Sequence, residues 1–325
     1  FWPCMVVVCK AGARWPDGIL PSRFPWFQPS MPQFSTIGLI SRRDNRDIVD
    51  TLLLVANFLG KRPGTAVVVD ESVDGLLGTH RFEVVQREQM GERCQLVIVV
   101  GGDGSMLKAA ALLAEQDIPV VGINRGRLGF LTDILPDDIE DTLDQILEGH
   151  YREEPRFLLE VATDAGGESR MLGSAMNDIV LHPGIAAQMI EFDLYVDGQF
   201  VCHQASDGLI IATPTGSTAY SLSAGGPIMD PRLDVLALVP MYPHSLSSRP
   251  IVVDSKSRIT LVIGERHNTL PQISCDGTVV HTASVGEAIR VQRKAKQLKL
   301  LHPVDYDYYA TCRSKLGWAQ RPVRS

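Results

Sequence analysis

Five consecutive aliphatic residues, 96–100, run directly into Gly101-Gly102-Asp103-Gly104, and an Ala- and Leu-rich stretch follows from Ser105. The aliphatic run predicts a buried β-strand, the glycines predict a tight turn, and the stretch after them predicts a helix. A helix that begins at such a turn presents free backbone N–H groups and the positive end of its dipole, which together bind phosphate. The segment therefore predicts an α/β unit with a phosphate loop formed by Gly101, Gly102 and Gly104.

An acid stands at the centre of this loop. A carboxylate there repels phosphate unless it holds a metal ion or takes up a proton, so Asp103 is the first candidate for chemistry. The alternative is a tight strand-to-helix turn in which the aspartate only caps the helix. The loop is neither a Walker A motif, which needs Gly-Lys-Ser/Thr, nor the dinucleotide fingerprint G-x-G-x-x-G. Lys108, one helical turn further on, is either a phosphate ligand or a solvated lysine.

Strand-like and helix-like segments alternate in the first half of the chain. Expected strands are 34–40, 66–69, 82–85, 96–100 and 118–122, and expected helices are 45–59, the stretch from Ser105, and 136–147. This alternation predicts a parallel sheet wrapped by helices.

From about residue 157 the pattern changes to short strand-like runs separated by Gly-Gly, Pro-Gly and Asp-Gly turns. The expected strands are 157–163, 176–181, 189–196, 200–203, 209–212, 251–253, 259–263, 272–275 and 288–292. Such spacing predicts an all-β sandwich or curled sheet, interrupted by one helix near Thr218. We therefore expect four segments. They are an unstructured N-terminal extension at 1–32, an α/β nucleotide-binding domain at 33–155, a β-sandwich domain at 156–297, and a C-terminal tail at 298–325 that returns to the α/β domain. The extension is rich in proline, and Met31 is the expected initiator.

Composition excludes several classes of function. The net charge of −7 argues against nucleic acid as the main partner, because phosphate backbones require a basic face. Six cysteines without a C-x-x-C pair suggest neither a disulfide framework nor a zinc site, so a reducing cytoplasm is expected. No apolar run approaches the roughly 18 residues of a membrane span.

Two further motifs carry polar side chains suited to a nucleotide. Asn177-Asp178 places an amide and a carboxylate at a strand start, where they could clamp the two hydroxyls of a ribose; the alternative is an ordinary Asn-Asp turn. The segment 206–227 is dense in hydroxyl and glycine residues, and Tyr220 within it offers a stacking surface. It contains no G-x-S-x-G nucleophile elbow.

These motifs together resemble a known family. Gly101–Gly104, Asn177-Asp178 and Thr213–Tyr220 resemble, in the same order, the three signature motifs of bacterial NAD kinases. The segments 124–130 and 222–227 extend the resemblance, which covers the chain from about residue 34 to 318. The Gly-Gly-Asp-Gly motif is shared with phosphofructokinases and diacylglycerol kinases, whereas the Thr-Ala-Tyr segment is far more specific.

The resemblance implies a Rossmann-like, phosphofructokinase-like α/β domain followed by an all-β sandwich. It implies transfer of the γ-phosphoryl group of ATP to the 2′-hydroxyl of the adenosine ribose of NAD, giving NADP, with Asp103 as the general base. It also implies Mg²⁺ carried by ATP rather than by a protein metal site. The resemblance also implies a homo-oligomer, commonly a tetramer, and neither nucleic acid nor membrane is an expected partner.

The resemblance further implies a set of NAD-binding residues: Asp103, Gly104, Lys108, Asn177, Asp178, Gln188, Ala205, Asp207, Ala212, Thr218, Ala219, Tyr220, Ser221, Leu222, Ser223 and Thr278. In this set Asn177 and Asp178 hold the ribose, Asp207 binds the nicotinamide end, and 218–223 line the adenosine pocket. At Gln188, Ala205 and Thr278 the chain departs from the residues that relatives often carry.

Two rival functions remain at this point. One is another kinase with the Gly-Gly-Asp-Gly loop, acting on a lipid or a sugar phosphate. The other is a dinucleotide-binding sensor without catalysis.

Overall fold

The structure is a computed structural model that describes residues 34–41, 48–126, 128–165, 168–184, 188–265 and 270–318. The predicted extension at 1–32, with Met31, lies outside the described residues, as does Arg127.

Five parallel strands form one end of a large sheet, in the order β3-β2-β1-β4-β5. Their bounds are Thr36–Ile40 (β1), Ala66–Asp70 (β2), Glu83–Val85 (β3), Leu96–Val100 (β4) and Pro119–Ile123 (β5). The helices are Val49–Lys61 (α1), Glu71–Leu77 (α2), Met90–Arg93 (α3), Asp103–Glu115 (α4) and Ile139–Leu147 (α5), with 3₁₀ turns at Arg87–Gln89 and Pro136–Asp138.

Strand β4 is buried on both faces. Leu96, Ile98 and Val100 belong to one apolar core, which contains α1 and α5. Val97 and Val99 point to a second core, which contains α4. A strand covered on both sides by helices is the arrangement that a continuous aliphatic run predicts, and the predicted α/β parallel sheet is confirmed.

Two helices of the α/β part were not predicted, and neither was the C-terminal helix described below. Helix α2 is only seven residues long and contains Gly75, so it offers too short a window for apolar periodicity. Its first turn is stabilised instead by Asp70, whose side chain accepts a hydrogen bond from the backbone N–H of Ser72 at 2.9 Å. Helix α3 spans a single turn. Helix α4 begins at Asp103, two residues earlier than expected.

The second half of the chain is antiparallel. The strands that continue the large sheet are Arg152–Ala165 (β6), Glu168–Ala175 (β7), Ile190–Val196 (β9), Gln199–Ser206 (β10), Ile259–Ile263 (β14) and Ala288–His302 (β17). A second sheet has the order β13-β12-β11-β8-β15-β16, with bounds Asp178–His182 (β8), Gly208–Ala212 (β11), Val235–Met241 (β12), Ile251–Asp254 (β13), Gln272–Cys275 (β15) and Thr278–Thr282 (β16). Both sheets contribute to one apolar core, as a β-sandwich requires.

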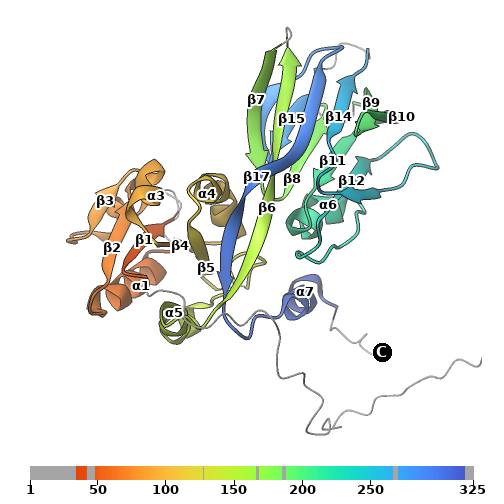
Figure 1. The fold of residues 1–325 in the computed structure, drawn as a ribbon. Helices are drawn as coiled ribbons and strands as arrows, with labels where there is room; N and C mark the ends of the chain where they lie inside the picture. Colours follow the sequence, from red (N-terminus) through yellow and green to blue (C-terminus); the bar gives the residue numbers. More distant parts are fainter. Residues whose placement is uncertain are drawn as a thin grey trace, which may run out of the picture.

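The two long strands β6 and β17 join the halves of the molecule. They pair with each other along almost their whole length, and 299–301 of β17 also pair in parallel with β5. Figure 1 shows this ribbon running from the α/β part up into the sandwich. The sequence predicted two separate segments here, because 292–297 is polar. A register shift between Arg293 and Gln297 lets one strand continue through that stretch.

Strands β7, β12 and β16 were also missed. In β12 the proline at position 240 argues against a strand, yet it lies next to the last residue, opposite Leu209. The last helix of the described residues is α7, Tyr308–Leu316, which begins at the side-chain cap of Asp307. None of the helices in the described part of the chain is long and apolar enough to cross a membrane.

Candidate active site

The phosphate loop has the predicted strand–turn–helix geometry. Gly101 follows β4 with a φ of 154°, and its N–H donates to the carbonyl of Ile123 at the end of β5. Gly102 is the N-cap residue of α4 and Asp103 occupies the first helical position. Gly104 is exposed, and a Cβ there would meet nothing within 4 Å. The N-terminus of α4 is therefore open on one side.

Asp103 does not cap its own helix. Its Oδ2 accepts a hydrogen bond from Phe130 N at 2.9 Å, and its Oδ1 accepts from Leu131 N and from the Thr132 hydroxyl, both at 3.0 Å. We call 130–132 the clamp loop. It holds the carboxylate in one orientation, and the capping alternative considered for this aspartate is wrong.

The residues around the clamp loop pack closely against one another and against Asp103. The Asn124 side chain donates to Thr132 Oγ1 at 2.8 Å, and Gly129 N donates to the Thr132 carbonyl at 2.9 Å. A Cβ on Gly129 would lie 2.2 Å from Asp103 Oδ1. Only glycine fits there, because any side chain would push the clamp loop off Asp103.

The second motif lies in the sandwich. Asn177 immediately precedes β8, and Asp178 is its first residue, paired with Ala212 of β11. The carboxylate of Asp276 accepts hydrogen bonds from three consecutive backbone N–H groups, those of Met176, Asn177 and Asp178, at 2.8–3.2 Å. Asp276 fixes this turn, although sequence reasoning gave it no role. The Asp276-Gly277 turn signal was the available clue.

Two acids therefore lie close together in a buried place. Burial, and then the neighbouring carboxylate of Asp276, raise the pKa of Asp178 to about 7. Burial also raises the pKa of Asp276, against the lowering effect of its three backbone donors. Asp178 can thus carry a proton near neutral pH, and can then donate as well as accept a hydrogen bond.

The third motif packs directly on the second. Thr213 donates its hydroxyl to the Met176 carbonyl at 2.6 Å, and its N–H donates to the Asn177 carbonyl at 2.9 Å. A Cβ on Gly216 would lie 2.1 Å from that same Asn177 oxygen. A 3₁₀ turn, Thr215–Thr218, and the one-turn helix Tyr220–Ser223 (α6) follow.

Tyr220 and Asp207 belong to this neighbourhood. Burial raises the pKa of Tyr220, and Tyr242, Asp178 and Asp207 raise it further by their charge. Tyr220 is nevertheless 47% exposed, so its ring is open to a ligand. Thr218 and Ala219 are half-buried, Ser221 is buried, Leu222 is half-buried and Ser223 is exposed.

The remaining predicted residues lie outside the three motifs. Lys108 is exposed on α4, one turn beyond Gly104 on the same face. Thr278 is exposed at the start of β16, next to the Asp276-Gly277 turn. Ala205 is half-buried in β10, opposite Glu191, and Gln188 is exposed ahead of β9.

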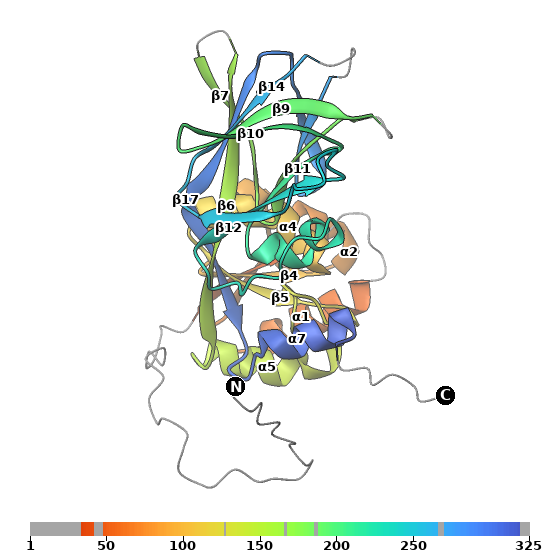
Figure 2. The same cartoon turned by 90° about the vertical axis from the view of Figure 1, so that its right-hand side faces the viewer.

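Apolar packing brings the acidic loop and the ribose motif to the same part of the molecule. Leu131 of the clamp loop and Met176 beside Asn177 belong to one buried cluster, which also contains Met106 and Ala110 of α4. Helix α7 supplies a second bridge: the Tyr308 ring lies 6.2 Å from that of Phe130, and its hydroxyl donates to the Met229 carbonyl at 3.3 Å. Met229 N in turn donates to Ser217 Oγ. In Figure 2, α4 lies between the strands of the sandwich above it and strands β4 and β5 below it.

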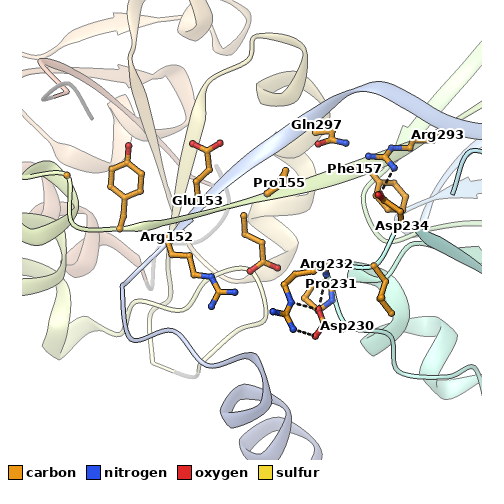
Figure 3. A pocket seen from close by; sticks show the side chains of 14 residues that line it. Arg152, Glu153, Pro155, Phe157, Asp230, Pro231, Arg232, Asp234, Arg293 and Gln297 are labelled. Carbon is orange, nitrogen blue, oxygen red and sulfur yellow. Dashed lines mark hydrogen bonds and ion pairs between the residues drawn. The ribbon is translucent and has the colours of Figure 1, made fainter. Parts of the chain in front are cut away.

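A separate cavity of about 890 Å³ opens between β6, β17 and 230–234 (Figure 3). Arg232 forms an ion pair with Asp230, and Arg293 pairs with Asp234 while its guanidinium lies 4.4 Å above the Phe157 ring. None of the predicted site residues that the structure describes lines this cavity. It is distinct from the site formed by the three motifs.

The fold and the site define a nucleotide-binding protein whose phosphate loop carries its own oriented acid. Comparison with known proteins identifies the family within this class. The ATP-NAD kinase N-terminal domain profile matches residues 37–151, and the ATP-NAD kinase C-terminal domain profile matches residues 176–302. An NAD kinase of Chromohalobacter salexigens is 53% identical over 291 residues, covering 90% of this chain and 99% of its own. One of Marinobacter nauticus is 53% identical over 295 residues, covering 91% and 100%.

Two solved structures share the fold. Yeast NADH kinase in complex with NADH has a TM-score of 0.81 at 24% identity, covering 89% of this chain and 90% of its own. An NAD kinase from Archaeoglobus fulgidus in complex with ATP has a TM-score of 0.62 at 24% identity, covering 87% and 97%. The chain belongs to the ATP-NAD kinase family, a family of phosphotransferases. The predicted resemblance and the predicted fold class are confirmed.

Proposed function

We propose that this chain transfers the γ-phosphoryl group of ATP to the 2′-hydroxyl of the adenosine ribose of NAD, giving NADP, with Asp103 as the general base. The observation that carries this proposal is the clamped carboxylate at the N-terminus of α4. Oδ1 accepts two hydrogen bonds from the clamp loop and Oδ2 accepts one. Since each carboxylate oxygen has two lone pairs, one acceptor position on Oδ2 is left for a substrate hydroxyl.

The same hydrogen bonds fix the direction of the Asp103 carboxylate. Phosphoryl transfer asks the protein mainly for positioning and charge neutralisation. A carboxylate held in one direction meets the first requirement. The backbone N–H groups of 101–104 and the dipole of α4 meet part of the second, because both favour the phosphates.

We propose that Asn177 and Asp178 hold the ribose through its hydroxyls, and that Asp207 binds the nicotinamide end. Segment 218–223 lines the adenosine pocket, with Tyr220 stacking on the base. Support comes from the proximity of Asp178 and Asp207 to Tyr220, since the charge of each raises the pKa of Tyr220. Lys108, Gln188, Ala205, Ala212 and Thr278 complete the proposed dinucleotide site.

Mg²⁺ is proposed to arrive on the triphosphate of ATP, where it neutralises charge during transfer. In the described residues no group of three or more His, Cys, Asp or Glu side chains could hold a metal ion. Three of the four acceptor positions of Asp103 are already used by the clamp loop, so this residue is a poor sole metal ligand. We further propose a cytoplasmic homo-oligomer. The four cysteines that the structure describes are free thiols, as a reducing compartment maintains them.

The test couples product to an NADP-specific dehydrogenase after incubation with ATP, Mg²⁺ and NAD. The parent protein should form NADP, and its absence would refute the function and leave the lipid-kinase or sensor alternatives. Asp103→Asn should lower kcat by about 10²–10⁴, the usual effect of a lost general base. The amide oxygen can still accept from Leu131 and Thr132, but the amide NH₂ group cannot accept from Phe130 N, so we expect a folded protein with a lower Tm. Near-normal turnover by this variant would remove Asp103 from the role of base.

A further inference from the structure

Four ionisable side chains are buried where the ribbon of β6 and β17 meets the first domain. They are Asp133, directly after the clamp loop, His302 at the end of β17, and Glu154 and Arg156 of β6. Their side chains are between 0% and 6% exposed. We call them the buried ion chain. Neither the sequence motifs nor the proposed mechanism uses them.

The buried ion chain reaches from the clamp loop to the turn at Thr215 through two hydrogen bonds at its ends and two charge contacts between them. His302 Nδ1 lies 2.7 Å from Asp133 Oδ2, and His302 Nε2 lies 3.8 Å from Glu154 Oε2. Glu154 Oε1 forms an ion pair with Arg156 Nη2 at 3.1 Å. Arg156 Nη1 then donates to Thr215 Oγ1 at 3.2 Å. Thr215 opens the 3₁₀ turn that leads to Tyr220.

Burying this many charges is costly unless they are paired, and removing one partner of a buried pair leaves the other uncompensated. Hydrophobic residues would stabilise a strand junction at least as well. The Tyr306 ring covers the cluster from one side, stacked on His302 with 3.9 Å between centroids. The interactions among these side chains have preferred directions. At one end they orient Asp133, which directly follows Thr132, and the Thr132 hydroxyl donates to Asp103.

We propose that the buried ion chain positions Asp103 relative to the dinucleotide segment, with His302 as its central positioning residue. At one end, the Asp133–His302 pair fixes the position of the clamp loop. At the other end, the Arg156–Thr215 bond fixes the start of the turn that carries Tyr220. The inference rests on the proposed function of Asp103 as the base. It assigns no chemical step to the four residues, which act only through Asp103 and Thr215.

His302→Leu should leave KM for NAD and for ATP within about twofold and lower kcat by about 10- to 100-fold, because a misplacement near 1 Å has effects of that size. His302→Asn keeps a donor close to the place of Nδ1 and should recover most of the kcat. Thr215→Val, at the opposite end, should mainly raise KM for NAD. A lower kcat in His302→Leu and a higher KM for NAD in Thr215→Val would distinguish positioning from a general loss of structure.

The matched control is His281 of β16, a second histidine bonded to a carboxylate, that of Glu287, which directly precedes β17 at the end far from His302. His281→Leu should lower Tm without a selective loss of kcat. If His302→Leu folds poorly, Asp133→Asn tests the same link through a change that preserves shape, and should also lower kcat.

A double-mutant cycle with Asp103→Asn decides whether the effect passes through the base. In that background His302→Leu should lower kcat by less than about twofold. Equal effects in both backgrounds would overturn the inference, as would a His302→Leu kcat matching that of His281→Leu. A parent protein that forms no NADP would instead refute the proposed function, so the two failures are distinguishable.

Discussion

Gly129→Ala is the sharpest test of the clamp loop. Its φ lies outside the left-handed region, so alanine meets no backbone strain there. The new methyl group would lie 2.2 Å from Asp103 Oδ1 and 2.4 Å from Thr132 Oγ1. Ordinary van der Waals contact begins near 3.4 Å, so the loop or the carboxylate must move by about 1 Å.

A shift of that size breaks the clamp. Hydrogen bonds of 2.9–3.0 Å would lengthen to about 4 Å, beyond the range in which they hold. Each bond to a charged acceptor contributes about 1.5–3 kcal/mol, so losing even one is a substantial part of a domain's stability. Asp103 would also lose its fixed direction, which should lower kcat about 100-fold.

The assay is NADP formation at saturating ATP and NAD, together with thermal unfolding of the same samples. Gly126→Ala is the matched control, because it lies in the same connection and a Cβ there meets nothing within 4 Å. It should retain kcat within about twofold. If Gly129→Ala turned over as fast as Gly126→Ala, the clamp would have no part in orienting Asp103.

Three further outcomes are expected. Tyr220→Ala should raise KM for NAD with little change in kcat, and an unchanged KM would exclude stacking on this half-exposed ring. Because the pKa of Asp178 is raised in the folded state to about 7, its contribution to stability is complete below about pH 4 and is lost as pH rises through 7. The Tm of Asp178→Asn relative to the parent should therefore increase from pH 4 to pH 8, and a constant difference would contradict the shift. Excess EDTA should stop NADP formation and added Mg²⁺ should restore it, whereas persistent turnover would argue against metal-bound ATP.

Local signals predicted the phosphate loop well. The run 96–100, the two glycines and the helix after them are contiguous, so each can be inferred from its neighbours. The helix start was placed two residues late because glycine and aspartate are weak helix formers. At its first turn, however, an aspartate is favoured by the helix dipole. The error concerns only the boundary, and the candidate acid was still identified.

The partners of that acid could not be predicted. Phe130, Leu131 and Thr132 lie 27–29 residues beyond Asp103, and no periodicity encodes a hydrogen bond over such a separation. The hydrogen bonds that Asp276 accepts from backbone N–H groups about 100 residues away could not be predicted either. Single-sequence patterns report which face of an element is apolar; they do not report which turn meets which strand.

The buried ion chain is the part of the structure that the sequence pattern predicts least. Glu154 and Arg156 alternate with other residues in a strand, so their charge predicts a solvent-exposed face. They are buried because Tyr306 and the turn at Thr215 lie against them, and β17 continues beside β5 past the bulge. Position 302 thereby comes to lie against Asp133, from a strand that the polar stretch 292–297 had appeared to end. A paired ribbon, rather than a loose connection, sets the distance between Asp103 and the segment that carries Tyr220. Charged residues in such a ribbon can be retained for the geometry they impose even where apolar ones would be more stable.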